Sequence, residues 1–471
     1  MFSKHGFLWV ILFAVAFYFA ASLDMATLLL VFSLLLLATS VILKFPQLVF
    51  PLAIISTPLS FYWFFDELSA GLSLPAEPLL VFLTLLFVVQ ILMGKRMNAA
   101  KHPVTILLIL NLLWLLLGVF LSRMPSISLK YFFAQSWFVV PLFFLGTVVF
   151  TEKRLREKAI WWYVVPLMVV IVYTTLHHAQ YGFGELASKR VMQPFYNDHT
   201  AYGAVSALFI PLLFLWTTDG EASKKHRLLS LMALLFLLVA LFLSASRAAW
   251  LSVFVAVLAF VVLKLKIRWY VLTGLALVSL SLLGLFRMQI VDYLSKNEDV
   301  SSSDLTQHIK SMANISTDVS NLERLNRWES AWLMTKDRPL TGFGPGTYMF
   351  EYAPFQRSSS KTVISTNFGE VGNAHSEYIG PMAERGIPGM LLVVILFVSI
   401  LYTGQQVWKH ADNARDKQFA LGLLLGLITY MTHGFLNNFL DTDKLAIPFW
   451  MFTAILVAMH VTIKNRKRVQ Y

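Results

Sequence analysis

The chain has 471 residues, of which 57% are hydrophobic and only 14% are charged, and its formal net charge is +12. Soluble domains contain about 25% charged residues, so this composition excludes an ordinary soluble globular protein. The chain has no cysteine, which excludes disulfides, iron–sulfur clusters and zinc–thiolate sites.

Apolar runs of about 20 residues recur along the chain, and this pattern predicts an all-α polytopic integral membrane protein. The first run has the form of a signal peptide, but Asp24 leads directly into the second run, so we expect an uncleaved first helix. The third run contains Pro46 and Pro51 and is short, so the expected number of spans is 12 to 14. The fourteen candidate spans lie near residues 7–23, 25–43, 46–63, 78–94, 103–121, 131–150, 159–176, 201–216, 228–244, 248–263, 269–286, 378–403, 418–436 and 445–463.

Lysine and arginine are concentrated in every second connection and at both termini. The positive-inside rule therefore predicts that both termini lie in the cytoplasm. The chain then divides into an N-terminal membrane part with about eleven spans (1–286), a large external loop containing short helices (287–377), and a C-terminal membrane part with about three spans and a basic cytoplasmic tail (378–471). This topology accounts for the net positive charge, and no concentrated basic face of the kind that binds nucleic acid is found.

The external loop is polar and rich in aromatic residues and glycine, so we expect the chemistry of the protein to take place there. A loop on that side of the membrane has no access to ATP or nucleotide sugars. Its substrate must therefore be presented on the outer leaflet in an already activated form.

Residues 243–250, LSASRAAW, place Arg247 where one span ends and the next begins. Ser244 and Ser246 are suited to cap the new helix, and a helix N-terminus beside a guanidinium is an anion site. The alternative is an arginine that reaches from the membrane interface to lipid headgroups.

Residues 320–332, SNLERLNRWESAW, predict an amphipathic helix that starts at a capping box of Ser320 and Glu323 and ends before Pro339. Arg324 and Arg327 are three positions apart and share one face of this helix, which makes them a candidate diphosphate clamp. The alternative is a helix that lies on the bilayer surface, with its arginines at lipid phosphates.

Residues 340–352, LTGFGPGTYMFEY, contain a GxGxG string, but no βαβ pattern surrounds it and no P-loop lysine follows it. We therefore reject nucleotide binding and expect a tight turn that shapes the loop.

Residues 373–389, NAHSEYIGPMAERGIPG, place His375 where the loop meets the next span. A histidine with its ordinary pKa of about 6.5 is suited to act as a general base near neutral pH. Glu377 and Glu384 are candidates to orient this histidine or the substrate, although a lone interfacial histidine is more often structural.

Two further loops hold polar candidates. In the 177–200 loop, the spacing of His177, His178, His199 and Asp198 matches no standard metal site, whereas Lys189 and Arg190 are suited to meet a lipid phosphate. After the thirteenth span, a cluster of amides and carboxylates either binds sugar hydroxyls or caps helices; it consists of Asn437, Asn438, Asp441 and Asp443.

The motifs SASR, ERLNRW, RPLTGFGPGTY and AHSEYI with GIPG occur in this order, and together they resemble the bacterial O-antigen ligase and O-antigen polymerase superfamily over roughly residues 195–460. The resemblance implies a metal-independent GT-C-type glycosyltransferase of the bacterial inner membrane, with no cofactor. Its implied donor is a glycan on undecaprenyl diphosphate, presented in the periplasm among membrane lipids. The implied acceptor is a lipid A–core sugar for a ligase, or a second lipid-linked repeat for a polymerase.

The resemblance also implies roles for single residues. Arg247 matches the arginine of the SxSR motif, and Arg324 matches the arginine four residues before the tryptophan; both are implied to grip the diphosphate. His375 matches the histidine implied to act at the acceptor hydroxyl. Two departures are visible: Ser376 stands where many relatives have Asn, and Arg327 fills a place that is often hydrophobic. Arg327 is therefore either a second phosphate ligand or a register alternative to Arg324.

These observations give a catalytic set of His375, Arg247 and Arg324, and no metal ligands. Arginines stabilise the charge of a leaving diphosphate without Mg²⁺, and attack opposite that group inverts the anomeric centre. The predicted substrate-binding residues are Arg327, Ser246, Lys189, Arg190 and Glu377.

The leading hypothesis is an O-antigen ligase-like glycosyltransferase. A polymerase of the same superfamily shares every motif and stays open as the nearest alternative. A polysaccharide transporter or flippase would suit the number of spans, but ionisable residues inside the spans are few and polar residues gather outside them.

Overall fold

The computed structural model describes residues 48–65, 70–95, 97–267, 319–358 and 372–469, together with Lys361 and Ser365. The candidate spans at 7–23, 25–43 and 269–286 lie outside these described residues, as does the first part of the predicted external loop.

The described parts of the chain contain eight helices that are long and apolar enough to cross a membrane. The prediction of an all-α multi-pass membrane protein is therefore confirmed. These helices are α5 (Pro103–Leu121), α6 to α7 (Pro125–Val149, continuous through the π-helical turn η3, Val140–Leu145), α8 (Lys153–Ala179), α10 (His199–Thr217), α11 (Lys224–Leu243), α12 (Arg247–Lys264), α18 (Ile379–His410) and α20 (Asp443–Val469). The shorter apolar helix α4 (Ala76–Leu92) and the 20-residue helix α19 (Ala414–His433) occupy two more of the predicted spans.

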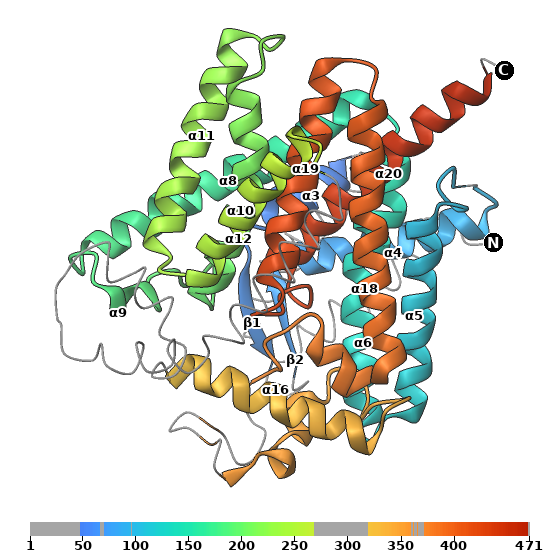
Figure 1. The fold of residues 1–471 in the computed structure, drawn as a ribbon, viewed down its shortest axis with the longest axis vertical. Coiled ribbons are helices and arrows are strands. Elements are labelled where there is room, and N and C mark those ends of the chain that lie inside the picture. The colour runs from blue at the N-terminus through green and yellow to red at the C-terminus, as the bar shows by residue number, and fades with distance from the viewer. Residues whose placement is uncertain are drawn as a thin grey trace, which may run out of the picture.

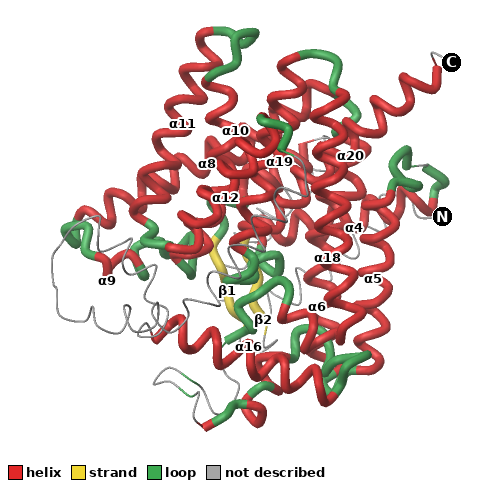
Figure 2. Tube along the Cα trace, in the orientation of Figure 1, coloured by secondary structure: helices red, strands yellow, loops and turns green. Residues whose placement is uncertain are grey.

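The prediction of a span at 46–63 is wrong. Only eight residues form a helix there, α3 (Val49–Ser56), and an antiparallel hairpin of β1 (Phe61–Phe65) and β2 (Ala70–Leu74) follows, with Phe61 opposite Leu74. Figure 2 shows these two strands inside a molecule that is otherwise helical where it is described. The segment FYWFF consists of aromatic residues, which favour strands, but they are apolar enough to extend a hydrophobic run.

The centre of the bundle is formed by α10, α19 and α20. In the most apolar stretch of α10 and of α20, 78% of the residues are buried inside the protein. The corresponding fractions are 22% in α12 and 28% in α5. Helix α19 lies close against α10 because Gly422 and Gly426 face it; a Cβ atom on Gly426 would stand 2.4 Å from the carbonyl oxygen of Leu208. Small residues four apart allow this close backbone approach in membranes.

The loops fall into two groups at opposite ends of the bundle (Figure 1). The α18–α19 connection and the C-terminus lie at one end, together with the loop that precedes α11, and these loops carry many of the lysines and arginines of the chain. We call this the basic end. Helix α16 (Val319–Asp337) lies across the opposite end, which we call the α16 end.

The predicted glycine turn fastens the α16 segment to the membrane helices. Gly342 and Gly344 have φ of 65° and 125°, and the backbone N–H groups of Phe343 and Gly344 donate to the carbonyls of Ala383 and Glu384 in α18. A Cβ atom on Gly342 would stand 2.3 Å from the backbone of Glu384, so no larger residue fits this contact. A small apolar core of its own, which includes Phe343, supports the segment together with the short helices α17 (Tyr348–Glu351) and η4 (Ala353–Phe355).

Candidate functional site

Helix α16 presents both predicted arginines toward the start of α18, but in different environments. Arg327 is buried, and its guanidinium is held by three groups: Nε lies 2.8 Å from Oε1 of Glu323, and Nη1 lies 3.0 Å from the carbonyl of Asn373 and 3.0 Å from Nε2 of His375. A Cβ atom on Gly372 would stand 1.9 Å from Nη1, so the backbone itself closes over this arginine. These contacts make Arg327 part of the protein framework.

His375 occupies a strained position, with φ of 48° in the left-handed region that histidine rarely adopts. Because a guanidinium N–H always donates, Nε2 of His375 is the unprotonated nitrogen and Nδ1 carries the proton. Burial lowers the pKa of His375 to about 3, and the charges of Arg327 and then Arg324 act in the same direction. In the ligand-free site the imidazole is therefore neutral and a weak base, and its role as a general base stays a prediction.

Arg324 is half-buried and lies on the side of α16 that faces the loop after α19. Its Nε donates to the carbonyl of Leu436 at 3.2 Å, and its charge reaches both His375 and His433. The two arginines and His375 therefore come together as the sequence predicted, and of the two arginines only Arg324 is partly accessible.

Arg247 is the first residue of α12, and the buried hydroxyl of Ser246 caps this helix by accepting from the N–H of Ala249 at 3.4 Å. The predicted cap is confirmed, and through this contact the side chain of Ser246 stabilises the start of α12. The next residue, Ala248, lies beside the ring of His433, which is itself within the field of Arg324. His433 thus connects the start of α12 with α16.

The carboxylate of Glu377 is hydrogen-bonded to the loop between α19 and α20. Its Oε1 accepts from the hydroxyl of Tyr430 at 2.5 Å and from the backbone N–H groups of Phe439 and Leu440 at 2.9 Å each. Burial raises the pKa of Glu377, and burial followed by the charge of Glu377 raises the pKa of Asp441 to about 7. These contacts favour a positioning role for Glu377 over direct binding of substrate.

The 177–200 loop holds two predicted substrate-binding residues, Lys189 and Arg190, and their role stays a prediction. Lys189 and Arg190 are exposed beyond the short helix α9 (Glu185–Ser188), and no contact given for the described residues links them to His375 or Arg324. The loop histidines point to three separate backbone carbonyls, and the described residues contain no group of three His, Asp or Glu side chains placed to hold a metal ion. The exception in this loop is His199, whose Nδ1 donates to the carbonyl of Ser244 at 2.7 Å, beside the helix start that carries Arg247.

An apolar cavity of about 230 Å³ opens between α18 and α19, next to the cluster. Tyr378, three residues after His375, forms one end of this cavity, and its ring stacks on Phe435 with centroids 4.2 Å apart. The remaining lining side chains are Val394, Phe397, Val398, Leu401, Ile428, Met431 and Thr432. A hydrocarbon chain would find an apolar surface here within a few residues of the arginines.

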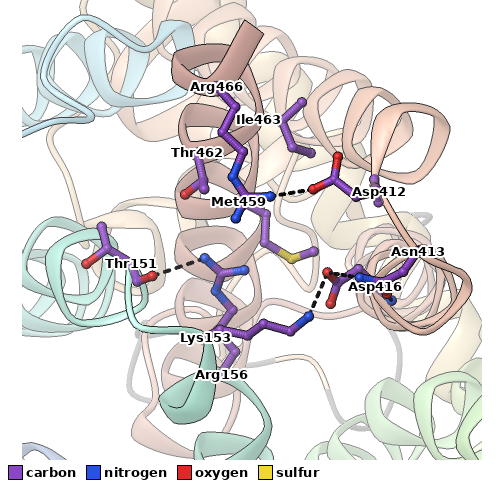
Figure 3. Close-up of a pocket in the computed structure, with 11 residues that line it drawn as sticks. Thr151, Lys153, Arg156, Asp412, Asn413, Asp416, Met459, Thr462, Ile463 and Arg466 are labelled. Atoms are coloured by element: carbon purple, nitrogen blue, oxygen red, sulfur yellow. Dashed lines mark hydrogen bonds and ion pairs between the residues drawn. The ribbon is translucent and has the colours of Figure 1, made fainter. Parts of the chain in front are cut away.

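A smaller polar pocket of about 130 Å³ lies elsewhere, where the first turn of α8 meets the α18–α19 connection and α20 (Figure 3). Its walls are joined by the ion pair of Lys153 with Asp416 at 2.9 Å and by the pair of Arg466 with Asp412 at 2.5 Å. These pairs tie neighbouring loops together at the basic end, so we assign the pocket a structural role.

At the α16 end, Arg324 and Arg327 thus lie beside a neutral His375, the start of α12 lies beside His433, and an apolar cavity adjoins Tyr378. The site therefore combines positive charge with a neighbouring apolar cavity in a multi-pass membrane protein.

The residues of this cluster lie in a segment of the chain that is similar to a known family. Residues 232–394 match the family model described as O-antigen ligase, and this range contains Arg247, Arg324, Arg327 and His375. This match over part of the chain supports a similarity to the O-antigen ligase and polymerase superfamily. A relative described as an uncharacterized protein from Haemophilus influenzae is 24% identical over 215 residues, which is 45% of this chain and 51% of the relative. The chain therefore spans about half the length of this curated relative.

Sequence reasoning missed His433 and gave His199 no role in the cluster. His433 closes an apolar helix, and Asn437 donates to its Nε2 at 3.1 Å. An ionisable residue at the end of an apolar span is a signal that would have identified it. No sequence signal pairs His199 with Ser244, because these residues are 45 positions apart and meet only through the packing of α10 against α12.

Proposed function

We propose that this protein is a glycosyltransferase of the O-antigen ligase type, which transfers a glycan from a polyprenyl diphosphate to an acceptor sugar on the periplasmic side of the inner membrane. The single observation that carries the proposal is the contact between Arg327 and His375, with Arg324 in range, inside the segment that matches the ligase family. The adjoining apolar cavity supports a lipid-linked donor.

In the proposed reaction, the hydroxyl oxygen of the acceptor attacks the anomeric carbon of the donor while the bond to the phosphate oxygen breaks. The diphosphate leaves with the electron pair, and Arg324 and Arg247 stabilise its charge. His375 takes the proton of the hydroxyl. The cavity beside Tyr378 would receive the first part of the prenyl chain.

Because the pKa of His375 is low in the ligand-free protein, this mechanism requires the bound donor to raise it. Burial, followed by the positive charges of Arg327 and Arg324, holds the imidazole neutral and weakly basic. An incoming diphosphate opposes these positive charges and therefore raises the pKa of His375. The histidine then becomes an effective base only when the donor is bound. The pH profile of kcat reports pKa values of the enzyme–substrate complex, and that of kcat/KM reports those of the free enzyme. As the pH is lowered, we therefore expect kcat to decrease at a higher pH than kcat/KM does.

The test is transfer from undecaprenyl-diphosphate glycan in proteoliposomes. We expect His375→Ala and Arg324→Ala each to lose about 10²–10³ in rate, as removal of a catalytic base or of charge stabilisation does. The matched control is Lys336→Ala, which removes a cation from the last turn of the same helix and should keep wild-type rates. Wild-type transfer by both site variants would overturn the proposal.

A polymerase reaction is the second candidate, because the family match covers both activities. Mass analysis of lipid-linked glycans in a deletion strain distinguishes the two. A lost ligase leaves long lipid-linked polymers, whereas a lost polymerase leaves single repeats.

A further inference from the structure

A cavity of about 1140 Å³ lies between α4, α5, α18 and α20, far from the site described above. Helix α5 begins at this cavity with His102 and Pro103, and it runs through 19 residues to the α16 end, where the backbone of Arg123 donates to Phe343. A helix of that length spans about 28 Å. The cavity is therefore near the opposite face of the membrane from His375.

The inner wall of the cavity is apolar and laterally open. Phe87, Phe144 and Val140 line it, and on its outer side Ile109 and Leu92 remain 43% and 81% exposed. Apolar side chains with this exposure on a membrane protein are suited to face lipid, so this wall fits a cavity that opens toward the hydrocarbon of the bilayer. Acyl chains, unlike a soluble metabolite, are suited to this wall.

The rim of the cavity is basic. Lys101 and Lys464 are both exposed there, and neither has an ion pair with a carboxylate in the described parts of the chain. The described lining contains no aspartate or glutamate, and two amide side chains, Asn98 and Asn465, add neutral donors. An anion at this rim would meet two ammonium groups and no opposing charge.

Two buried or half-buried histidines complete the rim. Nδ1 of His102 accepts from the N–H of Val104 at 3.2 Å, so Nε2 of His102 carries the proton and donates to Nδ1 of His460 at 2.9 Å. His460 then keeps its remaining proton on Nε2, as one more donor in the cavity wall. The N-terminus of α5, with its positive dipole end, lies beside this pair.

We propose that this cavity is a binding site for one acidic glycerophospholipid, with its phosphate between Lys101 and Lys464 and its acyl chains along α4 and α5. The charge of the rim selects the headgroup, and the apolar open wall requires a lipid rather than a free anion. The site is independent of the proposed transferase reaction, because its residues and its end of the bundle are different.

The test is native mass spectrometry of the full-length protein in detergent, titrated with dioleoylphosphatidylglycerol, dioleoylphosphatidylcholine or inorganic phosphate. Lys101→Gln with Lys464→Gln should weaken phosphatidylglycerol binding roughly thirty-fold, since each lysine near a lipid surface contributes about a factor of five. The control, Lys224→Gln with Lys225→Gln, removes the same charge from the exposed first turn of α11. Ile109→Trp should block the cavity, whereas Leu110→Trp, 45% exposed on the same helix and outside the lining, should not.

Loss of phosphatidylglycerol in both the lysine and Ile109→Trp variants, with both controls unchanged, supports the proposal. Three results overturn it: equal binding of phosphatidylglycerol and phosphatidylcholine, unchanged binding in either variant, or displacement of the lipid by millimolar inorganic phosphate. Gel filtration and the intrinsic fluorescence of tryptophan verify that each variant is folded. Transferase activity is not the readout, so the result stands apart from the proposed function.

Discussion

The ion pair between Arg327 and Glu323 lies within α16, and we expect the local stability of this helix to depend on it because both charges are buried. Both side chains are almost completely buried, at 7% and 3% exposure, and the two residues are one helical turn apart. Substitution Arg327→Met keeps most of the volume but leaves the carboxylate of Glu323 buried without its cation. Breaking a buried pair from one side costs about 3–5 kcal/mol.

The half-buried Arg324 provides the comparison. Among its described contacts is one hydrogen bond from Nε to a backbone carbonyl, and a bond of this kind contributes about 1 kcal/mol. Arg324→Met should therefore reduce transfer strongly while changing the stability of α16 little. The two arginines, three positions apart on one helix, are expected to separate into a structural and a chemical role.

Hydrogen exchange with mass spectrometry measures this difference directly, because it follows the local opening of α16 instead of the unfolding of the whole bundle. Arg327→Met should accelerate exchange of the α16 amides by roughly two to nearly four decades, at about 1.4 kcal/mol per decade. Arg324→Met should change it by less than about tenfold.

A double variant tests whether charge is the cause. Glu323→Gln added to Arg327→Met removes the uncompensated carboxylate, and neutralising both partners of a buried pair is often close to neutral in stability. Most of the lost protection should return. The reasoning is refuted if Arg327→Met exchanges like the wild type, if Arg324→Met is equally destabilised, or if the double variant recovers nothing.

Three further outcomes follow from the same geometry. Gly372→Ala should abolish transfer and loosen α16, because its Cβ would overlap the guanidinium of Arg327, whereas Gly182→Ala, also at positive φ but in open space, should keep full activity. Because the pKa of Asp441 is raised in the folded protein, its contribution to stability is present at low pH and is lost as the pH rises from about 4 to about 7; melting curves of Asp441→Asn should lack this dependence. Tyr430→Phe removes a hydrogen bond to Glu377 and should lower activity without changing KM for the donor, as steady-state kinetics would show, whereas a higher KM would instead place Glu377 at the substrate.

Much of the fold follows from the sequence because a membrane leaves few alternatives to a long apolar helix. Ten of the predicted spans correspond to described helices, and the 103–121 span matches α5 residue for residue. The hairpin at Phe61–Leu74 was missed because a run of aromatic residues satisfies a hydropathy criterion equally well as a strand or as a helix. Pairing with a second strand decides between them, and that contact is not visible in local composition.

The sequence predicted which residues form the site, but it did not predict which of their side chains are buried. The spacing of Arg324 and Arg327 places them on one face of a helix, but it cannot say which of them is buried. That outcome depends on Glu323, on the absence of a side chain at Gly372, and on His375, nearly 50 positions away. Burial, followed by the charges of Arg327 and Arg324, lowers the pKa of His375, and neither cause is visible in the local sequence around this residue.

The contacts of Arg327 also bear on the choice between the two arginines as donor ligands. A diphosphate that bound Nε or Nη1 of Arg327 would have to replace Glu323, the carbonyl of Asn373 or His375, which already hold these two nitrogens. Leaving the carboxylate of Glu323 buried beside a diphosphate would add a repulsion between like charges. We therefore infer that the donor meets Arg324 and Arg247, while Arg327 acts on the reaction through the field it exerts on His375.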